Sequence, residues 1–114
     1  MTKSPITTHV LNTAIGLPAQ GVAASLFKQA VTGEWSQVGS GVTNNDGRIN
    51  DLTSAPLETG EYRITFETGT YFETQNTETF YPSVTIHFWI ADAGQHYHVP
   101  LLLNPFGYST YRGS

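Results

Sequence analysis

Two histidines separated by a single residue, His96 and His98, are the side chains of this sequence best suited to catalysis. Alternate residues of a β-strand face the same side, so on a strand both imidazoles would share one face. An imidazole can accept a proton from water near neutral pH, which makes it a candidate general base for hydrolysis. With His9 on an earlier predicted strand, the three could also build a catalytic zinc site. From the residues alone, ordinary polar side chains on half-exposed strands remain an alternative.

Arg48 follows the turn glycine Gly47 and is one of only five basic residues. A guanidinium beside the histidines would favour an anionic or carbonyl-rich ligand over a metal cation. The alternative is that Arg48 is simply solvated at the end of a hairpin.

The C-terminal residues concentrate polar groups. The Tyr111 hydroxyl, the Arg112 guanidinium and the Ser114 α-carboxylate lie within four residues. Chain ends are usually frayed. Here, however, apolar and aromatic residues crowd positions 101–111, and we expect the terminus to be ordered.

Alternation of apolar and polar residues indicates the elements that must position these side chains. The clearest case is Val84, Ile86, Phe88 and Ile90. Turn-forming residues separate such segments. We predict strands at residues 7–12, 22–30, 35–43, 48–50, 61–68, 83–91, 96–103 and 108–112, and a short helix or ordered loop within residues 68–80. Short strands joined by turns predict an all-β sandwich or barrel, with residues 1–114 as a single domain.

Composition excludes several classes of function. Five Lys and Arg against nine Asp and Glu give a net charge of −4, so we expect no nucleic-acid partner. No apolar run is long enough for a membrane span, and the absence of cysteine excludes disulfides and thiolate metal sites. The first residues lack the apolar stretch of a signal peptide, so we expect a cytoplasmic location, or a peroxisomal or periplasmic one if a leader has been removed.

Several segments together resemble one known family. They are HVLN at 9–12 leading into GLPA at 16–19, TNNDGRI at 43–49, FYP at 80–82, HYHVPLLL at 96–103 and YSTYRGS at 108–114. Through them, nearly the whole chain resembles the 5-hydroxyisourate hydrolases, the transthyretin-related enzymes of urate degradation. Asn104 and Phe106 depart from the serine and tyrosine common in the family, and neither position belongs to the matched site.

The resemblance implies a transthyretin-like β-sandwich of eight strands and one short helix, assembled as a homotetramer, a dimer of dimers, with active sites between dimers. It implies hydrolysis of 5-hydroxyisourate to 2-oxo-4-hydroxy-4-carboxy-5-ureidoimidazoline without a metal or other cofactor. The residues that match the family's catalytic set are His9, Arg48 and His98, and those that match its substrate-binding set are Tyr111, Arg112, Gly113 and Ser114. We expect His96 to orient a neighbouring side chain by a hydrogen bond.

Three other functions stay open. A transthyretin-like carrier of small ligands would share the fold, because a fold does not fix a function. Transthyretin itself, however, lacks the terminal Tyr-Arg-Gly-Ser and the matched histidines and arginine. A zinc hydrolase would use His9, His96 and His98, and activity that survives chelation would exclude it. A carbohydrate-binding sandwich would depend on Trp35, Trp89 and the tyrosines, which serve equally well in a core or an interface.

Overall fold

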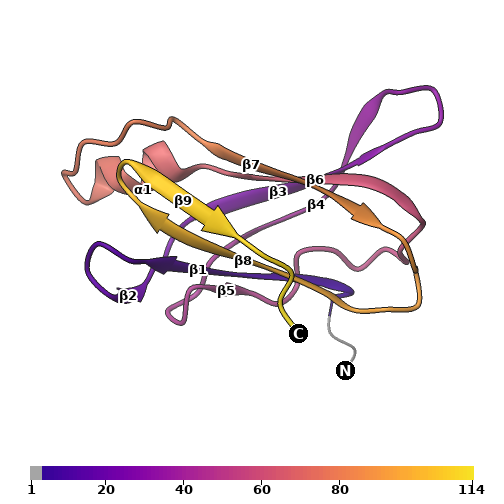
Figure 1. The fold of residues 1–114 in the computed structure, drawn as a ribbon, viewed down its shortest axis with the longest axis horizontal. Coiled ribbons are helices and arrows are strands. Elements are labelled where there is room, and N and C mark those ends of the chain that lie inside the picture. The colour runs from indigo at the N-terminus through magenta and orange to yellow at the C-terminus, as the bar shows by residue number, and fades with distance from the viewer. Residues whose placement is uncertain (1–3) are drawn as a thin grey trace.

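The computed structural model describes residues 4–114, which form two β-sheets packed face to face with one short helix at one end (Figure 1). In the first sheet, here called the β1 sheet, the strand order is β2-β1-β8-β9, and β5 also pairs with β1. In the second, the β3 sheet, the order is β4-β3-β6-β7. The bounds are β1 Ile6–Asn12, β2 Leu17–Pro18, β3 Ala23–Gln29, β4 Trp35–Val42, β5 Arg48–Ile49, β6 Gly60–Phe66, α1 Thr68–Thr74, β7 Val84–Ile90, β8 Tyr97–Asn104 and β9 Gly107–Thr110.

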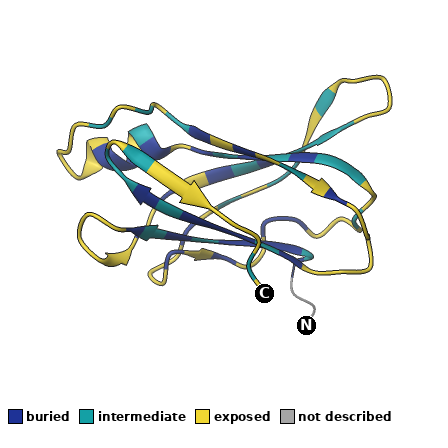
Figure 2. Cartoon of the chain, viewed as in Figure 1, coloured by how far each residue is buried: buried dark blue, intermediate teal, exposed yellow. Residues whose placement is uncertain are grey.

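The core lies between the sheets and follows from the alternation in the sequence. On β6, for example, Tyr62, Ile64 and Phe66 are buried, whereas the residues between them are only half-buried. Figure 2 shows buried segments on the strands of both sheets, with exposed residues concentrated in the loops. Fully burying one large apolar side chain contributes about 1.5–3 kcal/mol to the free energy of folding. Burial of these facing side chains is therefore the main interaction that holds the two sheets together.

One strand pair joins the two ends of the chain. β1 and β8 run parallel, with Ile6 opposite Tyr97 and Asn12 opposite Leu103, whereas the other pairings between the described strands are antiparallel. A parallel pair needs a long connection. Here the whole β3 sheet and the helix lie in that connection, so the N-terminal and C-terminal strands come together at the centre of the β1 sheet.

The predicted sandwich and its eight strands are confirmed, with ends that differ by at most two residues. The helix is confirmed at Thr68–Thr74, and the rest of the predicted segment is loop. β2 was not predicted, because two residues that include a proline show no alternation. Two ends near the candidate site were placed wrongly: β8 begins after His96, and β9 ends at Thr110, so Arg112 lies outside it.

Candidate active site

His9 and Arg48 lie opposite each other on β1 and β5. The flanking pair, Thr8 opposite Ile49, is buried in the core. Because successive strand residues face opposite sides, His9 and Arg48 both project from the outer face of the β1 sheet. Directly opposite residues on such a pair bring their Cβ atoms to about 4.5–5.5 Å. The register therefore places His9 and Arg48 next to each other on the outer face of the β1 sheet.

The turn before β5 fixes this register. The Asn44 side-chain oxygen accepts hydrogen bonds from the backbone N–H of Asp46, at 2.9 Å, and of Arg48, at 3.0 Å. Gly47 has a φ of 73°, which glycine adopts without strain, and a Cβ there would press on the Val10 carbonyl oxygen. The predicted turn at residues 44–47 is confirmed, and it delivers Arg48 to the strand position opposite the histidine.

His98 lies on the same outer face, one strand further into the sheet. On β8 it is opposite Thr7, and His9 is opposite Pro100, so the two histidines are diagonal neighbours on adjacent strands. The Thr7 hydroxyl lies 2.8 Å from His98 Nδ1 and 3.0 Å from His96 Nε2. As predicted, His96 and His98 are directed to the same side of the chain. His96 is therefore linked to His98 through hydrogen bonds to the Thr7 hydroxyl.

The C-terminal segment returns along β8 to His98. The Gly113 N–H donates to the His98 carbonyl oxygen at an N···O distance of 2.8 Å, and the two residues form an isolated β-bridge. The fit is close, because a Cβ added to Gly113 would lie 2.6 Å from His98 Cδ2. This contact ties down the terminus that the sequence predicted to be ordered, and it places the backbone of the predicted substrate-binding segment against an imidazole.

Tyr111 and Arg112 are directed elsewhere. Arg112 Nη2 donates to the Gln95 side-chain oxygen at 2.7 Å, and its guanidinium lies 4.3 Å from the centre of the Tyr97 ring. Both Tyr111 and Arg112 line a pocket of about 420 Å³ that also includes Trp89. Ser114 is exposed at the end of the chain. The backbone at Gly113 therefore meets His98, while the side chains of Tyr111 and Arg112 line a different part of the surface.

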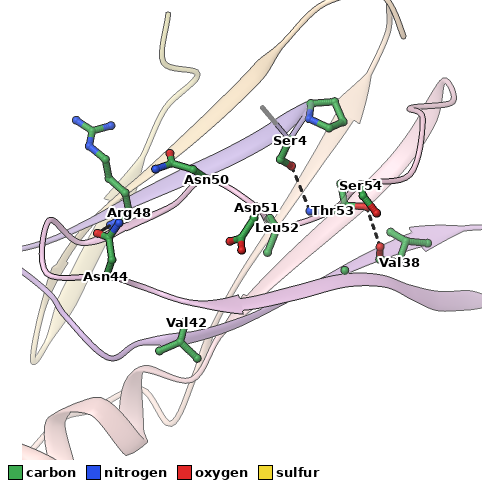
Figure 3. A pocket seen from close by; sticks show the side chains of 12 residues that line it. Ser4, Val38, Val42, Asn44, Arg48, Asn50, Asp51, Leu52, Thr53 and Ser54 are labelled. Atoms are coloured by element: carbon green, nitrogen blue, oxygen red, sulfur yellow. Dashed lines mark hydrogen bonds between the residues drawn. The ribbon is translucent and has the colours of Figure 1, made fainter. Parts of the chain in front are cut away.

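A larger pocket is at a different place, between β4 and the segment after β5 (Figure 3). It has a volume of about 810 Å³, and Arg48 is on its lining, whereas neither His9 nor His98 is. Figure 3 shows the Arg48 guanidinium pointing away from Asp51 and Val42, two of the other residues that line this pocket. The three predicted catalytic residues therefore share an open sheet face, and that face is not enclosed by a single chain.

Among residues 4–114 there is no group of three or more His, Cys, Asp or Glu side chains placed to hold a metal ion. Nor is the described helix long and apolar enough to cross a membrane.

Comparisons with known proteins place the chain in a family. The model of the HIUase/Transthyretin family matches residues 6–113. The 5-hydroxyisourate hydrolase of Mus musculus is 45% identical over 113 residues, covering 97% of this chain and 96% of that protein. The structure of Klebsiella pneumoniae 5-hydroxyisourate hydrolase has a TM-score of 0.85 and 38% identity, covering 99% of this chain and 100% of that one. The chain belongs to the HIUase/Transthyretin family, and the predicted resemblance is confirmed.

Fold similarity does not separate the enzymes from the carriers in this family. Sea bream transthyretin in complex with thyroxine has a TM-score of 0.90 at 31% identity, covering 96% of this chain and 95% of that one. That score is higher than the one for the Klebsiella hydrolase. The distinction must therefore come from functional residues and not from the fold.

Thr7 is the residue on the outer face of the β1 sheet that the sequence interpretation missed. It precedes His9 by two positions, so strand alternation alone puts both side chains on one face. That signal was present in the sequence, but a threonine on a strand is usually read as a residue favoured by strand geometry.

Proposed function

We propose that this protein hydrolyses 5-hydroxyisourate to 2-oxo-4-hydroxy-4-carboxy-5-ureidoimidazoline, a step of urate degradation. The observation that carries the proposal is the presence of His9, Arg48 and His98 together on one face of the β1 sheet. Full-length relatives named as 5-hydroxyisourate hydrolases support it.

The chemistry requires a base, a cationic group and a bound ring. His98, with His9 as its partner, removes a proton from water, and the water oxygen attacks the ring carbonyl carbon. Negative charge then develops on the carbonyl oxygen, where the Arg48 guanidinium stabilises it. The tetrahedral intermediate collapses with cleavage of the ring bond, and the proton returns to the leaving group. Tyr111, Arg112, Gly113 and Ser114 are proposed to bind substrate.

The finer proposal for the assembly is a homotetramer. β7 and β9 each pair with one strand only among the described residues, and the neighbouring aromatic side chains Trp89, Tyr108 and Tyr111 are exposed by 71%, 42% and 58%. Unpaired strand edges with exposed apolar groups are typical of surfaces that pair with another chain.

A second chain over the open histidine face would exclude bulk water, and the side chains of Tyr111 and Arg112 could then complete a site with residues of another copy. Analytical ultracentrifugation tests this, and a monomer at assay concentration would contradict it.

The other functions are less well supported. The carrier shares the fold, but full-length relatives at 44–45% identity are named as 5-hydroxyisourate hydrolases, which favours the enzyme. For a carbohydrate-binding surface, Trp35 would need a free ring face, but the Arg63 guanidinium lies 3.9 Å from its centre. Hydrolysis without a metal and the cytoplasmic location both stay predictions, which chelation and cell fractionation would test.

The deciding experiment is a spectrophotometric assay of freshly generated 5-hydroxyisourate with four samples. These are the intact protein, the intact protein after chelation, His98→Ala and the control Gln37→Ala. Gln37 is exposed on β4 of the opposite sheet. We expect rapid decay in the intact, chelated and Gln37→Ala samples, and a rate lower by about 10²–10⁴ in His98→Ala, the usual contribution of a general base. Decay no faster than in buffer with intact protein would refute the proposed function.

A further inference from the structure

The Thr7 hydroxyl forms hydrogen bonds to two imidazoles at once. Its oxygen is 2.8 Å from His98 Nδ1 and 3.0 Å from His96 Nε2. Thr7 itself is 4% exposed, and it is held in the parallel β1–β8 ladder directly opposite His98. This pair of hydrogen bonds, here called the bridge, is therefore fixed by strand register as well as by side-chain rotamers.

A hydroxyl has one hydrogen and two acceptor lone pairs, so it could accept from both rings; two arrangements instead give its hydrogen to one of the rings. In the first, Thr7 donates to His96 Nε2 and accepts from His98 Nδ1–H. In the second, Thr7 donates to His98 Nδ1 and accepts from His96 Nε2–H. The tautomers of the two histidines are therefore linked through one rotating hydrogen.

Of these two, only the first arrangement suits a general base at His98. With the proton on Nδ1, neutral His98 has Nε2 as an acceptor that can take a proton from water. The resulting imidazolium still donates from Nδ1 to Thr7, so no hydrogen bond of the bridge has to change during the reaction. In the second arrangement Nε2 already carries the proton and cannot act as a base.

We propose that the Thr7 hydroxyl, with His96 as its second partner, keeps the proton of neutral His98 on Nδ1, and that Thr7 and His96 are positioning residues for the hydrolysis. This inference rests on the proposed function, because it assigns the reacting nitrogen as His98 Nε2. It extends the expectation that His96 orients a neighbour: the hydrogen bond goes to Thr7, and Thr7 passes the orientation to His98.

The first test measures the tautomer directly and needs no substrate. Long-range ¹H–¹⁵N spectra of the intact protein report which nitrogen of His98 is protonated. We expect the Nδ1–H form in the wild type and in Thr7→Ser, and a mixture of tautomers in Thr7→Val, which removes only the hydroxyl function. Thr85→Val is the matched control, since Thr85 shares a 3.0 Å hydroxyl pair with Thr65 on the opposite sheet. A wild-type spectrum showing His98 protonated on Nε2 would overturn the proposal.

The second test is kinetic. We expect Thr7→Val to lower kcat roughly 10- to 100-fold with little change in KM, less than complete loss of a general base, because His98 is still present but no longer held in one tautomer and orientation. Thr7→Ser should restore most of kcat, and Thr85→Val should leave it unchanged. Equal losses in Thr7→Ser and Thr7→Val would show that the methyl group and packing, and not the hydroxyl, are responsible.

A double-mutant cycle tests the route through Thr7. If His96 acts only through this hydroxyl, His96→Ala lowers kcat in the wild type but has no further effect in Thr7→Val. Strictly additive losses would overturn that route. If the wild type fails to hydrolyse 5-hydroxyisourate at all, the proposed function fails, whereas the tautomer measurement still decides whether Thr7 controls the proton on His98.

Discussion

Replacing Gly113 with alanine tests whether the C-terminal segment is fitted against the His98 imidazole. The added methyl would lie 2.6 Å from His98 Cδ2 and 3.3 Å from Pro100 Cγ. Carbon atoms in ordinary contact are about 3.5–4.0 Å apart. Subtracting 2.6 Å from that range shows that the ring or the segment must shift by about 1 Å. Gly113 is not among the described glycines with positive φ, so the effect would come from this contact and not from backbone strain.

The size of the effect follows from that shift. A misplacement of about 1 Å at a reacting group costs about 10²-fold in rate, equivalent to about 2.7 kcal/mol of activation free energy. We expect kcat/KM for 5-hydroxyisourate to fall by about that factor in Gly113→Ala. The melting temperature should change little, because the affected segment lies outside the core at the end of the chain.

Gly107→Ala provides the control within the same C-terminal hairpin. Its added methyl would meet Asn104 Oδ1 at 3.7 Å, an ordinary contact, so we expect wild-type kcat/KM. Both variants are assayed for decay of 5-hydroxyisourate and for melting by circular dichroism. Wild-type kcat/KM in Gly113→Ala, or an equal loss in Gly107→Ala, would refute the reasoning that the segment positions His98.

Three further predictions concern the site and the core. Arg48→Lys keeps the positive charge but loses the planar, two-pronged donor geometry of the guanidinium. We expect kcat to fall by about 10- to 100-fold in Arg48→Lys and further in Arg48→Gln. An unchanged kcat in both variants would show that Arg48 takes no part in the reaction. Deleting residues 111–114 should abolish hydrolysis while leaving the cooperative unfolding transition intact, and a truncated protein that still turns over substrate would contradict the proposed binding role of this segment. Phe66→Ala, at a fully buried position, should lower the free energy of unfolding by about 3–5 kcal/mol, measured by urea titration, and a loss below 1 kcal/mol would show that the site can repack.

Much of the fold follows from the sequence because strand alternation and turn chemistry are local signals. The two strands that contain Ile64 and Ile86 show both signals, and their ends were predicted to within about two residues. Ends were less certain where tertiary contacts decide them. Arg112 continues an apolar, strand-like segment in the sequence, yet β9 stops at Thr110, and the chain then runs on along β8 until Gly113 pairs with His98 in the same register.

The candidate site was predictable in its residue types but not in its arrangement. His9, Arg48 and His98 could be singled out by chemistry and by the family resemblance. That His9 faces Arg48 depends on the β1–β5 register, and that His98 faces Thr7 depends on a parallel pairing across most of the chain. Long-range register leaves no signal within either strand, which is why Thr7 was missed as the bridge between the two C-terminal histidines.

The parallel pair β1–β8 has a consequence for how this protein becomes active. Thr7 and His98 are separated by 91 residues, so their contact requires closure of a long loop, and pairings of this kind make folding slow. The hairpins of the β3 sheet can form from neighbouring segments before that closure. We therefore expect a refolding chain to regain much of its β-sheet signal before it regains activity, so that recovery of hydrolysis reports the joining of the two ends of the chain.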